Sequence, residues 1–246
     1  MILQVQPNPI EQLLTVLGYW DFILAGFTMT MWLYMWALLI GFFLGLMLAN
    51  LRQYGGRILS RIATAYIEIV RGTPLLAQLL FIYFLPVALN ISVGNWNFLI
   101  HFTNRTILIL LDYRTLVGIL ALTLNSAAYQ AEYLRGAITS VSAGQLMAAQ
   151  SLGMSRLAGI THIVLPQALR RVIPAWSNEA AYLPKYTVVV YFIGVLELFA
   201  QAHAIVAITL ISLITYIIVA LIFLVTISLI SKGLDILHKR TAIPGL

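Results

Sequence analysis

Residues 22–51 contain no Asp, Glu, Lys or Arg, and this uncharged stretch limits the folds that are open to the chain. A helix needs about 20 mostly apolar residues to cross the hydrocarbon core of a bilayer. A second uncharged stretch lies between Glu197 and Lys232. Of the 246 residues 61% are hydrophobic and 9% are charged, and the core of a water-soluble domain of this length could not bury so much apolar surface. The sequence therefore predicts an all-α membrane protein.

The apolar segments predict five transmembrane helices in a single membrane domain over residues 1–246. Their expected ranges are about 22–51, 62–89, 107–135, 172–196 and 205–231. The three middle segments also contain ionisable residues, among them Glu68, Glu132 and Glu179. Charges at membrane depth are costly and usually face a protein interior or a water-filled cavity, so these residues are functional candidates.

The basic residues predict the orientation, because Lys and Arg gather in cytoplasmic loops close to the ends of spans. With the N-terminus outside and the C-terminus in the cytoplasm, ten basic residues lie inside, against Arg105 and Arg114 outside. Arg71 and Lys185 then lie at membrane depth. The ten are Arg52, Arg57, Arg61, Arg135, Arg156, Arg170, Arg171, Lys232, Lys239 and Arg240.

Several classes of function are disfavoured by the composition. The chain has no cysteine, so disulfides and thiolate chemistry are excluded. Its four His residues are scattered without metal-ligand spacing, no catalytic triad is indicated, and no basic patch for nucleic acid is visible in the sequence. The N-terminus shows no pattern of a cleavable signal peptide. We expect no metal site and no nucleic-acid partner.

Residues 142–165 are too polar to cross a membrane and too regular for a disordered loop. Ser142 and Gln145 have the spacing of a capping box, Gly153 suits the left-handed position that ends a helix, and Pro166 is expected to stop a second helix. One face of that second helix is apolar, with Leu157, Ile160, Ile163 and Val164. The pattern predicts two short helices in a cytoplasmic loop.

This loop resembles the coupling loop of ATP-binding-cassette (ABC) importer permeases. The family pattern is Glu-Ala-Ala, three residues, Gly, about nine residues, and then an aliphatic residue, any residue, Leu and Pro. The chain reads Met147-Ala148-Ala149, then Gly153, then Ile163-Val164-Leu165-Pro166. Met147 replaces the acidic residue of the pattern.

The flanking segments 68–84, 121–141 and 165–179 narrow the resemblance to the permeases for polar amino acids of the histidine, glutamine and arginine type. The resemblance runs from about Gly26 to the basic residues at the C-terminus. One departure is the segment 183–188, which reads LPKYTV where the family has Leu-Leu-Lys-Asp-Thr-Ser.

The resemblance implies a permease subunit that forms the translocation path and is not itself an enzyme. It implies a cytoplasmic dimer of ABC ATPases, a second permease that is an identical or a sister chain, and an external protein that binds the amino acid. This chain lacks a Gly-x-x-x-x-Gly-Lys-Ser/Thr loop, so ATP and magnesium are expected on the partner subunits, with no cofactor here. The residues expected to couple to the ATPase are Leu146, Met147, Ala148, Ala149, Gly153 and Leu157.

Two charged pairs have helical spacing. Glu68 and Arg71 are three residues apart and could neutralise one another, and Glu132 and Arg135 repeat this spacing where a pair would fix the coupling loop to the bundle. The segment 72–74, Gly-Thr-Pro, is expected to break the helix that precedes it. Such a break either exposes backbone groups to a substrate or forms a simple bend.

The residues expected in the substrate path are polar groups within the apolar segments. Glu179 could receive the ammonium or guanidinium group of an amino acid, and Lys185 either pairs with Glu179 or binds a substrate carboxylate. Asn125 and Ser126 contact substrate or form helix-to-helix hydrogen bonds. Thr73 lies in the expected break.

Two alternative functions remain open from the sequence. The first is an ion-coupled carrier that works alone, which should show duplicated halves or acidic relays within the membrane. The second is a membrane sensor or assembly subunit that docks an ATPase and conducts nothing. Both are membrane proteins bound to lipids, and the resemblance favours the importer permease in a bacterial cytoplasmic membrane.

Overall fold

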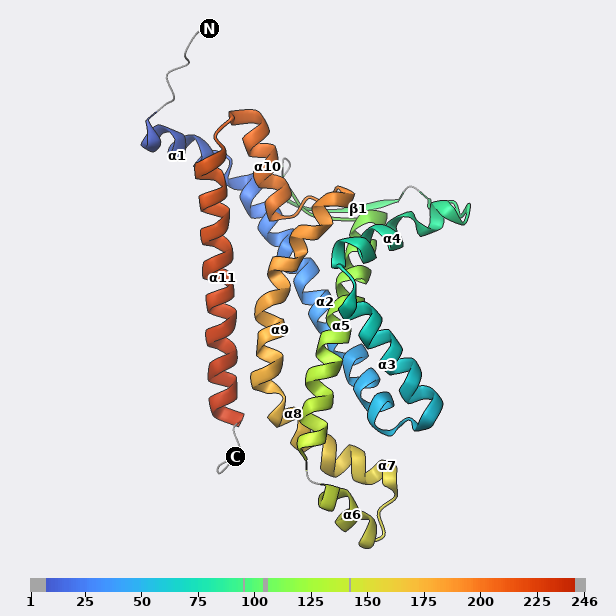
Figure 1. The fold of residues 1–246 in the computed structure, drawn as a ribbon. Coiled ribbons are helices and arrows are strands. Elements are labelled where there is room, and N and C mark those ends of the chain that lie inside the picture. Colours follow the sequence, from blue (N-terminus) through green and yellow to red (C-terminus); the bar gives the residue numbers. More distant parts are fainter. Residues whose placement is uncertain (1–7, 95, 104–105, 142, 242–246) are drawn as a thin grey trace. The chain divides into compact units, whose positions relative to one another are not determined.

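The computed structural model describes residues 8–94, 96–103, 106–141 and 143–241, and most of them are helical (Figure 1). The first elements are α1 (Pro9–Leu17), α2 (Trp20–Tyr54), α3 (Gly56–Gly72), α4 (Leu75–Ala88), β1 (Asn97–Thr103) and β2 (Thr106–Asp112). They are followed by α5 (Tyr113–Ser140), α6 (Ala143–Ser151), α7 (Arg156–Gly159), the π-helical turn η1 (Ile160–Val164) and α8 (Leu165–Arg171). The last elements are α9 (Ile173–Tyr186), the 3-10 helix η2 (Thr187–Ile193), α10 (Leu198–Thr209) and α11 (Ser212–Thr241).

Two of the described helices are long and apolar enough to cross a membrane alone, α2 and α11 over Ser212–Arg240. Two further crossings are possible if α3 with α4, and α9 and η2 with α10, each count as one broken span. The predicted third span, α5, has the length but is not among them. It carries Asn125, Gln130, Glu132 and Arg135, which lower its mean hydropathy. The count of five spans therefore stays a prediction.

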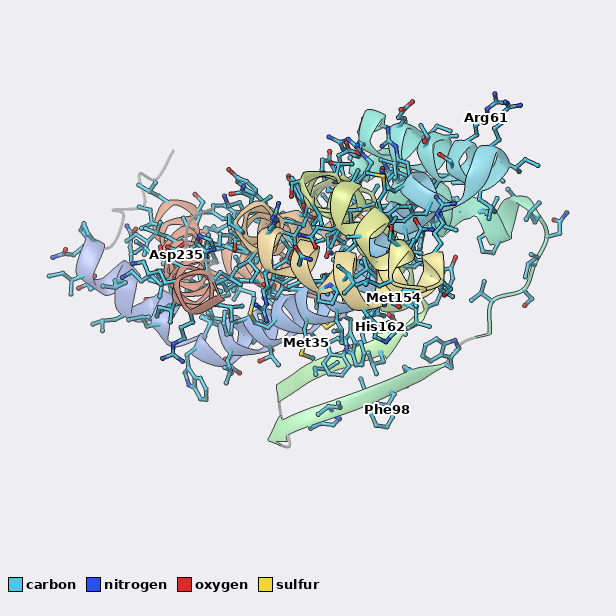
Figure 2. The ribbon with its side chains drawn as sticks, turned by 90° about the horizontal axis from the view of Figure 1, so that it is seen from below. Met35, Arg61, Phe98, Met154, His162 and Asp235 are labelled. Carbon is cyan, nitrogen blue, oxygen red and sulfur yellow. The ribbon has the colours of Figure 1, made fainter. Side chains whose placement is uncertain are left out.

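The expectation of an all-helical chain is wrong at residues 97–112, where β1 and β2 form an antiparallel hairpin. The register pairs Asn97 with Asp112 and Phe98 with Leu111. Phe98 is labelled on β1 in Figure 2, and its side chain is exposed. The third span was expected to begin at residue 107, but the helix begins at Tyr113. Short apolar runs rich in β-branched residues suit a paired strand as well as a helix.

The expected last span, 205–231, is divided in the structure. The helix α10 ends at Thr209, Leu210 adopts the left-handed conformation with φ 59°, and α11 starts at Ser212. Before α10, Gly194 ends η2 with φ 80°, a conformation that glycine adopts without steric cost. The predicted fourth span, 172–196, corresponds to α9 continued by η2.

The chain divides into two compact units, and α2, α4, α5, α9 and α11 each contribute residues to both. The first unit comprises residues 1–35, 79–121 and 184–226. In its core Leu198 and Ala202 of α10 pack with Val219 of α11 and with Phe27 of α2. The second unit comprises residues 36–78, 122–183 and 227–246, and it contains most of the residues that the sequence singled out.

In the second unit, two glycines four residues apart let α2 approach α5 closely. A Cβ atom at Gly41 would lie 2.9 Å from Gln130 Nε2, and one at Gly45 would lie 3.0 Å from the backbone oxygen of Ala127. Small residues at this spacing allow helix backbones to pack together in membranes. The core beside them contains Leu48, Ala63, Ile67, Ala127 and Ala131.

The predicted coupling loop folds as α6 and α7 with the turn η1, packed against one another (Figure 1). Gly153 follows α6 with φ 87°, which confirms its left-handed position. The expectation for Pro166 is wrong: η1 passes directly into α8, and Pro166 lies in the first turn of α8. The ring follows the π-helical turn η1, where the hydrogen-bond register of the helix is already interrupted, so the N–H that proline lacks is not missing from a regular ladder. Ser142 lies outside the described residues.

Candidate functional site

A buried polar cluster in the second unit centres on Glu179 of α9. Only 3% of Glu179 is exposed, and its Oε1 accepts a hydrogen bond of 2.7 Å from Ser126 Oγ of α5. Ser126 is fully buried. No ion pair within the described part of the second unit involves Glu179. Burying a charged carboxylate with one hydrogen-bond donor costs free energy, unless a cation or further donors also contact it.

Gln130 extends this cluster from the next turn of α5. Its Nε2 donates to Ser126 Oγ at 3.0 Å and to the backbone oxygen of Leu38 at 3.2 Å, while its Oε1 accepts a bond of 2.6 Å from Trp176 Nε1. The spacing of four residues places Ser126 and Gln130 on one face of α5. The cluster therefore joins α2, α5 and α9 through side chains that hold the Ser126 hydroxyl toward Glu179.

A second polar chain connects α5 with the break between α3 and α4. Asn125 Nδ2 donates to Gln78 Oε1 at 3.1 Å, and Gln78 Nε2 donates to Thr73 Oγ1 at 2.8 Å and to the backbone oxygen of Thr73 at 3.0 Å. Gln78 Nε2 also lies 2.7 Å from the backbone oxygen of Val70. These carbonyls belong to the end of α3, where a helix leaves acceptors unsatisfied.

The predicted break at residues 72–74 is confirmed. The helix α3 ends at Gly72, Thr73 is extended with φ −119° and ψ 147°, and α4 begins at Leu75 after Pro74. Proline disfavours helical backbone in the residue before it, which explains the extended Thr73. The break brings Thr73 and Gln78 together and leaves Thr73 exposed.

The expected path residues fall into three places. Glu179 and Ser126 share the buried cluster, and Asn125 and Thr73 are joined through Gln78. Lys185 is exposed and belongs to the first unit. The sequence interpretation missed three members of these networks, Gln78, Gln130 and Trp176. A usable signal was the spacing of Gln130, four residues after Ser126 on an apolar helix.

The predicted pair of Glu132 and Arg135 is confirmed, with 2.6 Å between Oε1 and Nη2. Glu132 Oε2 also lies 2.6 Å from Arg52 Nη1 and 3.9 Å from Arg71 Nη1. The predicted pair of Glu68 and Arg71 is wrong. Glu68 instead lies 3.6 Å from Arg52 of α2, whose guanidinium group also contacts Glu132. One carboxylate of α5 thus gathers three guanidinium groups from α2, α3 and α5.

The expected coupling residues divide into a packed set and an exposed set. Ala149 is buried and Leu146 is half-buried, and a Cβ atom at Gly159 of α7 would lie 2.7 Å from Leu146 Cδ1. Met147 is 61% exposed and Leu157 is 71% exposed, and Ala148 and Gly153 are exposed as well. Leu146 and Ala149 therefore pack α6 against α7, while Met147 of α6 and Leu157 of α7 are exposed apolar side chains that a partner could contact.

Residues 41–243 match the family described as the binding-protein-dependent transport system inner membrane component. The match covers most of the chain and includes Thr73, Asn125, Ser126, Gln130 and Glu179 of the site described above. The protein is thus a membrane permease by class, and the chain belongs to this family.

Several relatives resemble the chain over most of its length. The glutamine transport system permease protein GlnP of Escherichia coli is 34% identical over 189 residues, which are 75% of this chain and 77% of GlnP. The nopaline transport system permease protein NocM of Agrobacterium fabrum is 35% identical over 192 residues, 76% of this chain and 74% of NocM.

Solved structures share the fold. The crystal structure of an amino acid ABC transporter with histidines has a TM-score of 0.78 at 32% identity, covering 92% of this chain and 97% of that chain. The inward-facing methionine ABC transporter MetNI has a TM-score of 0.62 at 19% identity, covering 97% of this chain and 100% of that chain. The latter likeness concerns the fold alone.

Proposed function

We propose that this chain is the permease subunit of an ATP-driven importer for polar amino acids. The observation that carries the proposal is the buried Glu179 cluster in a chain of this transport family. The named relatives transport glutamine and nopaline, and a solved relative is an amino acid transporter. A carboxylate held by a single hydroxyl is suited to receive the cationic group of an amino acid.

In this proposal Glu179 binds the ammonium or guanidinium group of the substrate, and Ser126 holds the carboxylate in position. Asn125 and Thr73 of the same unit offer neutral hydrogen-bonding groups. Lys185, an exposed residue of the first unit, stays a candidate for binding a substrate carboxylate. A broken helix within a membrane can present backbone carbonyls to a ligand, and the exposed Thr73 lies at the break between α3 and α4.

The exposed side chains of Met147 and Leu157 would contact an ATPase subunit. Apolar side chains that stand in water on two short helices lower the free energy of a complex when a partner covers them. Movement of the ATPases would then reach the transmembrane helices through residues 142–165. Because Met147 stands where the family pattern has an acid, this contact would be apolar.

The assembly that we propose contains a cytoplasmic ABC ATPase dimer, a second permease, either identical or a sister chain, and an extracytoplasmic amino-acid-binding protein. ATP and magnesium would be bound by the ATPase subunits. The chain would lie in a bacterial cytoplasmic membrane with its N-terminus outside and its C-terminus inside. The two permeases would rock as rigid bodies to give alternating access.

The test is to purify the tagged chain in mild detergent, identify the copurifying proteins by mass spectrometry, and reconstitute the complex in vesicles. Uptake of radiolabelled glutamine, histidine and arginine is measured with ATP and with a non-hydrolysable analogue. We expect an ATPase in the complex and uptake of at least one amino acid with ATP alone. Uptake driven by an ion gradient without ATP would indicate a carrier, and a bound ATPase without any uptake would indicate a sensor.

A further inference from the structure

Four arginines surround a pocket of about 420 Å³ in the second unit, where α2 ends and α3 begins. We call it the arginine pocket, and its lining includes Arg52, Arg57, Arg61 and Arg156 together with Tyr54 and Ser60. No acidic side chain lines it. Arg52, Arg57 and Arg61 are close in the sequence, and the fold adds Arg156 of α7 from far along the chain.

Three of these arginines keep their charge uncompensated. Arg52 is paired with Glu132 and Glu68, whereas no ion pair in the described part of the second unit involves Arg57, Arg61 or Arg156. Arg156 instead lies over the ring of Tyr54, with 5.8 Å from Cζ to the ring centroid. Figure 2 shows Arg61 projecting from its helix. The pocket therefore carries a net positive charge and several free guanidinium donors.

An exposed apolar stripe runs along α3 beside the arginines. Ile58, Ile62 and Ile69 are spaced by four and seven residues, which places them on one face, and each is more than 60% exposed. Arg57 and Arg61 form the adjacent row of the same helix. A helix with arginines beside an exposed apolar face is typical of contact with the interface of a bilayer.

The position of the pocket at the end of α2 agrees with the level of lipid headgroups. The 35 residues of α2 extend over about 52 Å at 1.5 Å a residue, well beyond a hydrocarbon core of about 30 Å. The end of α2, with Arg52 and Tyr54, can thus lie among phosphate groups while the middle of the helix crosses the core.

We propose that the arginine pocket binds the headgroup phosphate of an anionic phospholipid, with the acyl chains along the apolar stripe of α3. Guanidinium groups bind phosphate with two parallel hydrogen bonds, and basic pockets between transmembrane helices suit anionic headgroups. A soluble anion would use the charge but not the stripe. The acidic side chains of a protein partner would compensate the charge, but they would not cover Ile58 and Ile62. This inference does not depend on the proposed substrate or on the proposed orientation.

The experiment measures lipid preference on the intact purified transporter complex in detergent-lipid micelles. Spin-labelled phosphatidylglycerol and phosphatidylcholine are added, and the immobilised fraction of each gives their relative association constants. The variant is the triple substitution Arg57→Gln, Arg61→Gln and Arg156→Gln. We expect the preference for phosphatidylglycerol to fall by about tenfold, since each basic residue near a surface contributes to binding of anionic lipid.

The matched control is Lys232→Gln, Lys239→Gln and Arg240→Gln, which removes the same three charges from exposed positions of α11. These charges also lie at the end of a candidate span, so the control should lose some preference, but clearly less than the arginine triple variant. An unchanged preference in the arginine triple variant, or an equal loss in the control, would overturn the proposal. Displacement of phosphatidylglycerol by millimolar inorganic phosphate would also overturn it in favour of a soluble anion.

A protein partner at the pocket makes a different forecast. The arginine triple variant would then lose copurifying ATPase while its preference for phosphatidylglycerol stays unchanged, and this outcome contradicts the lipid site. If the triple variant is not produced in the membrane, Arg57→Gln and Arg61→Gln are measured singly. Each should lower the preference by about twofold, and an unchanged value in both would reject the proposal.

Discussion

Glu179 accepts a single hydrogen bond from the described residues of its unit, from the Ser126 hydroxyl, while almost all of its surface is buried. Burial disfavours a charged carboxylate, and one neutral donor offsets little of that cost. Two explanations remain distinct. The side chain either awaits a cationic ligand, or it serves as a polar contact between α5 and α9. The glutamine variant separates them.

The change Glu179→Gln keeps the size of the side chain and removes its charge. If Glu179 binds the cationic group of the substrate, a charge-assisted hydrogen bond of about 1.5–3 kcal/mol is weakened, and apparent affinity for uptake should fall by roughly ten- to a hundred-fold. Basal ATP hydrolysis by the complex should remain. Uptake kinetics in vesicles measure the first, and phosphate release measures the second.

Glu68→Gln is the matched control, because it makes the same chemical change at a side chain that is 66% exposed. Glu68 lies 3.6 Å from Arg52 and is not part of the Glu179 cluster. It should leave apparent affinity unchanged. A Glu179→Gln protein with unchanged affinity and a lowered melting temperature in detergent would show that Glu179 is a structural contact.

The side-chain pairs that could not be predicted from the sequence are those between residues far apart along the chain. Glu132 and Arg135 were predictable as partners because one turn of helix brings them together. The additional pairing of Glu132 with Arg52, and the contact of Glu179 with Ser126 across 53 positions, depend on how helices pack. Helical spacing alone also misassigned Glu68, since Arg52 of α2 lies within reach of it.

At the scale of elements, the approach of α2 to α5 depends on Gly45. A Cβ atom there would lie 3.0 Å from Ala127 O and 3.1 Å from Ala131 N, both of which are backbone atoms that cannot move aside alone. Gly45→Ala should therefore destabilise the protein by about 1–3 kcal/mol, as overpacking does. The readout is a lower melting temperature in detergent.

Gly136→Ala is the control for this substitution. Gly136 lies within α5, and no atom would lie within 4 Å of an added Cβ. Alanine is the better helix former, so Gly136→Ala should stabilise the protein by at most about 0.5–1 kcal/mol. The melting temperature should then stay unchanged or rise slightly. Equal melting temperatures for the two variants would contradict the close packing at Gly45.

The exposed apolar surface on α6 and α7 makes a prediction of its own. The double change Met147→Asp and Leu157→Asp places two charges where the proposed ATPase contact needs apolar side chains, so copurification of the ATPase should fall at least tenfold, since each 1.4 kcal/mol lost is about tenfold. The chain should still insert in the membrane, because both side chains are exposed.

The control is Ile236→Asp, on α11 and 54% exposed, which should leave copurification unchanged. Full ATPase retention by the double variant would exclude Met147 and Leu157 from the interface.

The sequence predicted helices well where apolar residues run long and poorly where they run short. The turn at Gly153 and the break at Thr73 were predictable, because Gly and Pro have specific backbone requirements. The hairpin at 97–112 was not, since its apolar residues fit either periodicity. The division of the last predicted span at Leu210 was not predictable either, because no Gly or Pro marks it in the sequence.

For the molecule as a whole, the basic residues predict an orientation with the N-terminus outside and the C-terminus in the cytoplasm. The fold alone fits either orientation. The chain has no cysteine, so single cysteines can report on accessibility without background. A cysteine at Asn97, which is exposed beside β2, should react with an impermeant maleimide in intact cells. A cysteine at Ala143 of α6 should react only after the cells are opened. The reversed pattern would overturn the orientation.

The membrane-protein class and the transport family were predictable from the sequence. The composition and the long motif around Gly153 indicate them whether or not each helix is predicted correctly. The number of spans was less predictable. In α5 the polar residues Asn125, Ser126 and Gln130 make hydrogen bonds within the protein. They lower the mean hydropathy of α5, so hydropathy alone does not identify this helix as a span.

The buried contact between Ser126 and Glu179 also bears on how the chain is made. The segment that contains α9 includes Glu179 and Lys185, and a charged residue near the middle of a nascent helix adds about 2.5–3.5 kcal/mol to its insertion by the translocon. On the ribosome α5 emerges before α9 and can already present the Ser126 hydroxyl when Glu179 leaves the exit tunnel. We therefore expect insertion of the segment that contains Glu179 to depend on the earlier presence of α5.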